Sequence, residues 1–155
     1  MSIRVHLLAN IHRKDAVAAA SKAAFLLHSH GVVVFAHSES AKILDLPPVS
    51  ESEFAHCNLA ISFGGDGTLI RVAQLCSVKS TPVLGVYYGR FGFVTQCLGE
   101  QVDETLSDFL EGNSEFEERM MLETHILRGG SSVADLHAHR NKYLTTIVQN
   151  EGSST

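Results

Sequence analysis

Short and mostly apolar runs recur along the first part of the chain, and polar or helix-forming stretches separate them. Four runs have the length of a strand: Val5–Ala9, Val32–Ala36, Leu59–Phe63 and Pro82–Tyr87. They are continuous rather than alternating, which is typical of strands buried on both faces of a parallel sheet. The pattern therefore predicts a parallel sheet at the centre of the fold.

The segments between these runs predict helices. Asp15–His30 is rich in alanine with apolar residues on one face, and Gly31 stands where a glycine commonly ends a helix. Further helices are predicted over Ser40–Leu46, Glu51–His56, Thr68–Ser77 and Val102–Leu110, with Gly112 ending the last one. This alternation predicts the α/β class, a doubly wound and mostly parallel sheet that fills a first domain over residues 1–112.

From Glu115 onward the pattern changes to strict alternation of apolar and polar residues. Gly129-Gly130 then supplies two residues able to take positive φ, as a tight hairpin requires, and Val133–His139 and Tyr143–Val148 predict further strands. Residues 113–155 are therefore expected to form the first strands of an antiparallel β domain that is incomplete at Thr155.

Composition narrows the function classes. The chain has 155 residues with a formal net charge of −5, which suits one ordinary domain and argues against a large basic surface for nucleic acid. No apolar run approaches the ~20 residues that span a bilayer, so no membrane association is expected. The three cysteines are widely spaced and odd in number, which indicates a reducing compartment; a cytoplasmic location is expected.

One stretch carries chemistry: Gly64-Gly65-Asp66-Gly67-Thr68 directly follows a predicted strand and precedes a predicted helix. Such a turn lies at the carboxyl end of a sheet strand, where open α/β sheets bind ligands, and the helix start favours phosphate groups. Asp66 adds an acceptor that suits a ribose hydroxyl or a metal ion. The spacing matches neither a P-loop nor the usual dinucleotide fingerprint. A plain turn in which Asp66 only caps the helix is the alternative.

These five residues resemble the GGDG signature shared by NAD kinases, diacylglycerol and sphingosine kinases, and 6-phosphofructokinases. A second stretch, Pro82–Thr95, is similar to the P-x-L-G-V-N-x-G-R-L-G-F-L-T segment of NAD kinases, with Tyr87 in place of the usual Asn. Glu118–Leu122 also resembles the strand that opens their second domain. The downstream Asn-Glu or Asn-Asp pair of that family is missing where it is expected, and the only such dipeptide, Asn150-Glu151, lies later and is interpreted as an accidental match.

The resemblance implies transfer of the γ-phosphoryl group of ATP to the 2′-hydroxyl of the adenosine ribose of NAD, with a divalent metal, Mg²⁺, bound through ATP. It implies that Asp66 contacts the ribose hydroxyls as catalytic base or orienting acceptor. The remaining substrate-binding residues that it implies are Gly65, Gly67, Thr68, Ile70, Arg71, Gly92 and Phe93, and Arg90 is a further candidate phosphate contact. It also implies a homo-oligomer that binds small-molecule nucleotides.

Other interpretations stay open. The chain as written is expected to have little or no NAD kinase activity, since most of the second domain is missing. It could instead be a non-catalytic nucleotide-binding or interaction module, or a fragment of a diacylglycerol- or sphingosine-type lipid kinase. No metal site held by the protein is expected, because His137 and His139 share a strand face without a third ligand at a recognisable spacing.

Overall fold

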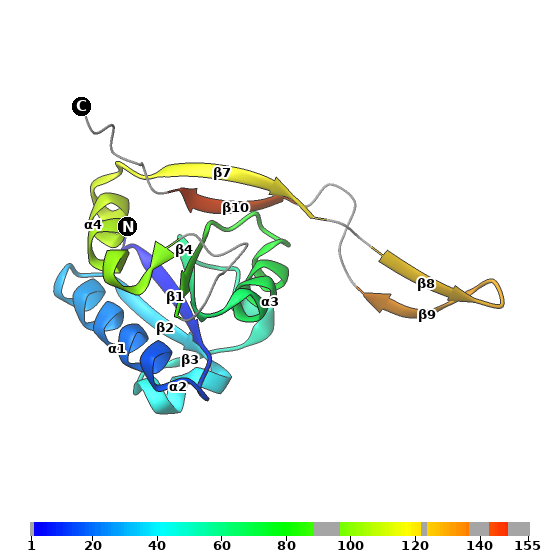
Figure 1. The fold of residues 1–155 in the computed structure, drawn as a ribbon, viewed down its shortest axis with the longest axis horizontal. Helices are drawn as coiled ribbons and strands as arrows, with labels where there is room; N and C mark the ends of the chain where they lie inside the picture. The colour runs from blue at the N-terminus through cyan, green and yellow to red at the C-terminus, as the bar shows by residue number, and fades with distance from the viewer. Residues whose placement is uncertain (1, 89–96, 122–123, 137–142, 149–155) are drawn as a thin grey trace.

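The apolar runs of the sequence form the central strands of the structure (Figure 1). The computed structural model describes residues 2–88, 97–121, 124–136 and 143–148. Its elements are β1 (Arg4–Ala9), α1 (Lys14–Ser29), β2 (Val33–His37), α2 (Ser38–Leu44), β3 (Pro48–Val49), the 3₁₀ turn η1 (Glu51–Glu53), β4 (Leu59–Gly64), α3 (Asp66–Cys76), β5 (Val83–Tyr87), β6 (Cys97–Leu98), the 3₁₀ turn η2 (Gly99–Gln101), α4 (Val102–Glu111), β7 (Glu115–Met120), β8 (Thr124–Arg128), β9 (Ser131–Leu136) and β10 (Tyr143–Val148).

The main sheet has the strand order β3-β2-β1-β4-β5-β10-β7, and β6 also pairs with β5. The first five strands in this order, β3, β2, β1, β4 and β5, are mutually parallel. The register places Ala9 of β1 opposite Phe63 of β4. The chain moves outward from β1 toward β2 and β3, and then returns to the other side of β1 to form β4. Strand order thus reverses between β1 and β4, which confirms the predicted doubly wound sheet.

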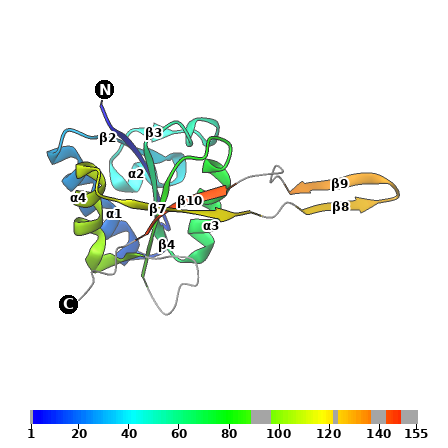
Figure 2. The same cartoon turned by 90° about the horizontal axis from the view of Figure 1, so that it is seen from above.

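Helices cover both faces of this sheet (Figures 1 and 2). Residues of α1, α2 and α4 share one apolar core with the strands, and residues of α3 form a second core with Phe54. The strand side chains between them, such as Leu7, Ile61 and Phe63, are fully buried. Burying each side chain of this size contributes roughly 1.5–3 kcal/mol, so the sheet rigidly holds the loops at its ends.

Glycines end two of the helices as the sequence predicted. Gly31 follows α1 with φ 75°, and the next N–H, of Val32, donates to the carbonyl of Leu27 at 3.1 Å. Gly112 ends α4 with φ 78°. Both residues adopt the left-handed conformation, which costs glycine little because it has no Cβ.

The predicted helix over Glu51–His56 is wrong: the structure has only the 3₁₀ turn η1 there. The next residue, Phe54, is fully buried, and its ring packs against the rings of His6 and His37. This segment is therefore a short, mostly polar turn that the buried Phe54 side chain anchors to the sheet, and only three of its residues are helical. The short edge strand β3 was not predicted from the sequence either.

The chain after α4 forms two antiparallel pairs. Strand β10 pairs with β7 and joins the parallel sheet through a single register pair, Thr146 opposite Val83. Strands β8 and β9 form a separate hairpin that extends away from the body, and Gly129 and Gly130 turn it with positive φ, as predicted (Figures 1 and 2). The domain boundary at residue 112 stays a prediction.

Within the described residues, no helix combines the length and the apolar character that crossing a bilayer demands.

Candidate functional site

The glycine-rich turn lies at the carboxyl end of β4, and its neighbours on both sides hold it. The N–H of Asn10, which follows β1, donates to the carbonyl of Phe63 at 2.9 Å, and the N–H of Tyr88 donates to the carbonyl of Gly64 at 3.2 Å. Gly65 is the extended N-cap of α3, without a side-chain cap. Asp66 is therefore the first residue of the helix rather than its cap, where a carboxylate interacts favourably with the helix dipole.

The three glycines of the turn differ in what they do. None has positive φ, so backbone conformation does not require them. A Cβ on Gly64 would lie 2.6 Å from the hydroxyl oxygen of Thr68 and 3.3 Å from the Cβ of Asn10, so this position must stay bare. A Cβ on Gly65 or Gly67 would meet nothing within 4 Å. The fold thus requires the first glycine, and the other two leave the backbone open to an approaching molecule.

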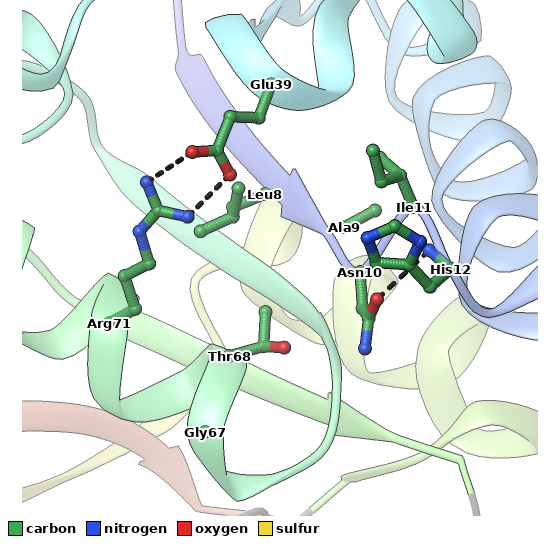
Figure 3. A pocket seen from close by; sticks show the side chains of 9 residues that line it. All are labelled: Leu8, Ala9, Asn10, Ile11, His12, Glu39, Gly67, Thr68 and Arg71. Carbon is green, nitrogen blue, oxygen red and sulfur yellow. Dashed lines mark hydrogen bonds and ion pairs between the residues drawn. The ribbon is translucent and has the colours of Figure 1, made fainter.

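A pocket of about 650 Å³ opens beside this turn, at the reversal of strand order (Figure 3). Its walls come from the end of β1 and the loop that follows it, the first turn of α2 and the first two turns of α3. The lining residues are Leu8, Ala9, Asn10, Ile11, His12, Glu39, Gly67, Thr68 and Arg71. Crevices at this place in open α/β sheets are the usual ligand sites.

Asn10 and Thr68 form one end of the pocket, where Figure 3 shows the Thr68 hydroxyl pointing toward the Asn10 side chain. The backbone N–H of His12 donates to Asn10 Oδ1 at 3.1 Å. Only the amide oxygen can accept that bond, so the Asn10 NH₂ group turns the other way and remains a donor. The first N–H groups of α3 add donors here, since a helix start has no intrahelical acceptors for them.

Arg71 and Glu39 form the opposite end. Arg71 Nη1 lies 2.5 Å from Glu39 Oε2, and Arg71 Nη2 lies 2.7 Å from Glu39 Oε1 and 3.1 Å from Glu51 Oε1. Hydrogen bonds from the guanidinium hold the pKa of Glu39 below its usual value, and the same bonds raise the pKa of Arg71. This paired fork ties α2 and η1 to α3.

The structure brings together three of the residues that the sequence singled out: Gly67, Thr68 and Arg71 line the pocket. Gly65 and Asp66 lie next to it in the turn, and Ile70 is half-exposed on α3. Gly92, Phe93 and Arg90 lie outside the described residues, as do His137 and His139.

Groups that could hold a metal ion do not gather in the described part of the chain, where no cluster of three or more His, Cys, Asp or Glu residues occurs. The cysteines are reduced thiols, and burial raises the pKa of Cys57 to about 12. A nucleophilic thiolate is therefore not part of this site.

Sequence reasoning missed the pocket wall formed by Asn10, His12 and Glu39. Each follows a buried parallel strand directly or within three residues, since β1 ends at Ala9 and β2 ends at His37. Polar residues in that position meet at one edge of the sheet. That signal was available, but its use required the strand order.

Comparison with known proteins identifies the family to which this chain is similar. The family model described as "ATP-NAD kinase N-terminal domain" matches residues 5–114. The NAD kinase of Chromohalobacter salexigens is 40% identical over 88 residues, which cover 56% of this chain and 30% of that protein. The chain spans about half or less of the length of the curated relatives it matches.

Two solved structures share the fold. Yeast NADH kinase complexed with NADH superposes with a TM-score of 0.71 at 17% identity, covering 94% of this chain and 46% of that one. An NAD kinase from Archaeoglobus fulgidus in complex with ATP gives a TM-score of 0.54 at 24% identity, covering 75% and 40%. At these identities the likeness establishes the α/β architecture.

Proposed function

This chain belongs to the ATP-NAD kinase N-terminal domain family, and from that premise we propose that it is the nucleotide-binding part of an NAD kinase-like phosphotransferase. The reaction transfers the γ-phosphoryl group of ATP to the 2′-hydroxyl of the adenosine ribose of NAD, giving NADP. One observation carries the proposal: Gly65 and Gly67 leave open space beside a pocket at the reversal of strand order, where nothing in the fold itself demands glycine.

The phosphate groups of the nucleotides in this reaction fit the backbone N–H groups and the helix start at this edge of the sheet. Bare backbone at Gly67 and the start of α3 suit phosphate oxygens, because N–H groups and the helix dipole both attract an anion. The two structural neighbours, one complexed with NADH and one with ATP, support nucleotides of these classes as ligands of the fold.

Asp66 is the residue we assign to the reacting hydroxyl. A carboxylate at the first position of α3 would accept the proton of the ribose 2′-hydroxyl, or hold that oxygen in line with the phosphoryl group. General-base assistance contributes typically 10²–10⁴-fold in rate. Ile70, Gly92 and Phe93 are proposed to contact the adenine, and Gly65 and Thr68 the neighbouring parts of the nucleotide.

A magnesium ion would be held mainly by ATP. Mg²⁺ keeps several waters and binds through phosphate oxygens with one or two carboxylates. That mode fits the described residues, which offer no cluster of three or more potential ligands. The ion supplies charge neutralisation on the phosphates, and the protein positions the hydroxyl.

Oligomerisation and location complete the proposal. Strand β7 ends the sheet on one side and exposes Phe116 and Met120, so a homo-oligomer would cover apolar surface there. The odd number and wide spacing of the three cysteines support a cytoplasmic location. Light scattering on the purified chain tests the first point.

The experiment for the function compares the full chain with its Asp66→Asn variant. Calorimetry measures binding of ATP and NAD, and a coupled assay measures NADP formation. The proposal expects both nucleotides to bind to the chain. NADP formation by this chain is expected to be weak, and whatever rate is measured should fall by 10²-fold or more in the variant without loss of fold. Binding without turnover in the unmodified chain would favour the non-catalytic binding module, and absence of nucleotide binding would refute both.

A further inference from the structure

The two ends of the pocket differ in the groups they offer a ligand (Figure 3). At one end the Asn10 amide NH₂, the Thr68 hydroxyl and the start of α3 present hydrogen-bond donors. At the other end Glu39 presents a carboxylate with Leu8 beside it, and Ala9 and Ile11 line the space nearer to Asn10. A ligand with an anionic end and a hydroxyl-bearing end matches this polarity.

The cation at the second end is already paired. Arg71 donates to both oxygens of Glu39 and also to Glu51, so these three side chains carry a net charge of −1. A phosphate group placed there meets no unpaired positive charge and faces a carboxylate. This end therefore favours uncharged donors over phosphate oxygens.

Glu39 keeps the capacity to accept further hydrogen bonds. Its side chain is 51% exposed, and a carboxylate has about four lone-pair sites, of which the Arg71 fork occupies two. The bidentate pairing also fixes the plane of the carboxylate, because both oxygens are held at 2.5 and 2.7 Å from the guanidinium nitrogens. Such a pre-oriented acceptor loses little freedom when a ligand binds.

The position of Glu39 in the fold points to a sugar. It follows β2, the strand next to β1, and in dinucleotide-binding α/β sheets an acidic residue after the second strand accepts hydrogen bonds from ribose hydroxyls. Here the phosphate-binding turn follows β4 instead of β1, yet both turns lie at the same edge of the sheet.

We propose that Glu39 is a specificity-determining residue that binds the sugar hydroxyls of a nucleotide whose phosphates lie at the Asn10–Thr68 end of the pocket. The inference rests on the proposed nucleotide-binding function and adds the orientation of the ligand. Arg71 is a positioning residue in this arrangement: it holds the carboxylate in place and leaves phosphate binding to the other end.

The test measures discrimination between ligands that differ in one hydroxyl. Calorimetry on the full chain compares ATP with 2′-deoxy-ATP and 3′-deoxy-ATP, with inorganic tripolyphosphate as a ligand that has no sugar. Removing one of the two hydroxyls is expected to weaken binding by about tenfold, the size of one hydrogen bond to a charged group. In Glu39→Gln the ratio of the dissociation constant of the deoxy analogue to that of ATP is expected to fall to within about threefold of unity.

Glu51→Gln is the matched control. Glu51 also pairs with Arg71, at 3.1 Å, but it does not line the pocket. If Glu39 acts only by restraining Arg71, both variants change the ratio alike. If Glu39 touches the sugar, Glu51→Gln keeps the discrimination of about tenfold.

Three results overturn the inference. The unmodified chain binds ATP and both deoxy analogues equally, or Glu39→Gln leaves the ratio unchanged, or Glu39→Gln alters only the dependence on Mg²⁺, which makes Glu39 a metal ligand instead. In each case nucleotide binding itself persists, so the proposed function stands. Failure of ATP and NAD to bind at all refutes the function together with the inference.

Discussion

Gly64 and Gly67 are only three residues apart, and the structure predicts opposite effects for the same substitution at the two positions. In Gly64→Ala the new Cβ would lie 2.6 Å from the Thr68 hydroxyl oxygen, about 0.8 Å inside the 3.4 Å at which ordinary contact begins, and 3.1 Å from the Thr68 Cβ. Thr68 is β-branched and lies in the first turn of α3, so few side-chain rotamers are open to it. The Asn10 Cβ, 3.3 Å away, blocks the other side.

Inserting a methyl group into a site this tight costs about 1–3 kcal/mol in the free energy of unfolding. For a chain of 155 residues each kcal/mol corresponds to about 2–4 °C, so Tm is expected to fall by about 2–12 °C. In Gly67→Ala the methyl group meets open space, and alanine replaces glycine inside a helix. The free energy of unfolding should stay constant or rise by up to about 1 kcal/mol.

Urea unfolding followed by circular dichroism measures both effects, since a loss of 1–3 kcal/mol lowers the midpoint by roughly 0.5–1.5 M. Thr68→Ala in the Gly64→Ala background removes the atom at 2.6 Å and should recover part of the loss. Gly67→Ala should nevertheless weaken ATP binding, because its methyl group fills the space left for the ligand. A Gly64→Ala chain as stable as the original, or a strongly destabilised Gly67→Ala chain, would refute the reasoning.

Three further predictions concern stability and reactivity. Burial lowers the pKa of His6 below its ordinary 6.5, so the unfolded chain binds more protons and the free energy of unfolding should fall as the pH drops below 6.5. Urea titrations between pH 5 and 8 measure this dependence on pH. His6→Gln should make the free energy of unfolding depend less on pH, and an unchanged dependence would contradict the reasoning. Gly112→Ala should lower the free energy of unfolding by about 1 kcal/mol, because residue 112 has φ 78°. Gly112→Asn should lower it less, because asparagine adopts this conformation more readily than alanine. Equal losses for the two variants in thermal unfolding would count against this argument. Burial raises the pKa of Cys57 to about 12, so little of the reactive thiolate is present at pH 7. A thiol reagent should therefore label Cys57 far more slowly in the folded chain than in urea. Equal labelling rates would contradict this.

The sheet was predictable because its strands are continuous apolar runs, and the observed bounds of β1, β2, β4 and β5 differ from the predicted ones by at most one residue at either end. Glu51–His56 failed because polar residues without apolar periodicity gave no signal for the buried role of Phe54, which depends on His6 and His37 from distant strands. The attachment of β10 to β5 also escaped prediction, since one register pair leaves no pattern in the sequence.

In the candidate site, too, some residues could be predicted from the sequence and others could not. The residues around Asp66 were predictable because strand, glycines and helix start are contiguous in the sequence. Asn10 and Glu39 were not, because 28 or more residues separate each of them from Gly67 and only the strand order brings them together. The family resemblance implied that Arg71 binds substrate, whereas its pairing with Glu39 depends on where α2 packs.

The place of the glycine turn after β4 explains why this pocket has two unlike walls. Strands β1 and β4 are adjacent and parallel, with Ala9 opposite Phe63, so both loops that follow them open into one crevice. The loop after β1 carries the side chains of Asn10 and His12, and the loop after β4 presents almost bare backbone. Backbone N–H groups bind any phosphate without regard to the rest of the ligand, whereas side chains at fixed positions discriminate between ligands. Affinity should therefore depend most on Gly65 and Gly67, and selectivity on the residues that follow β1 and β2.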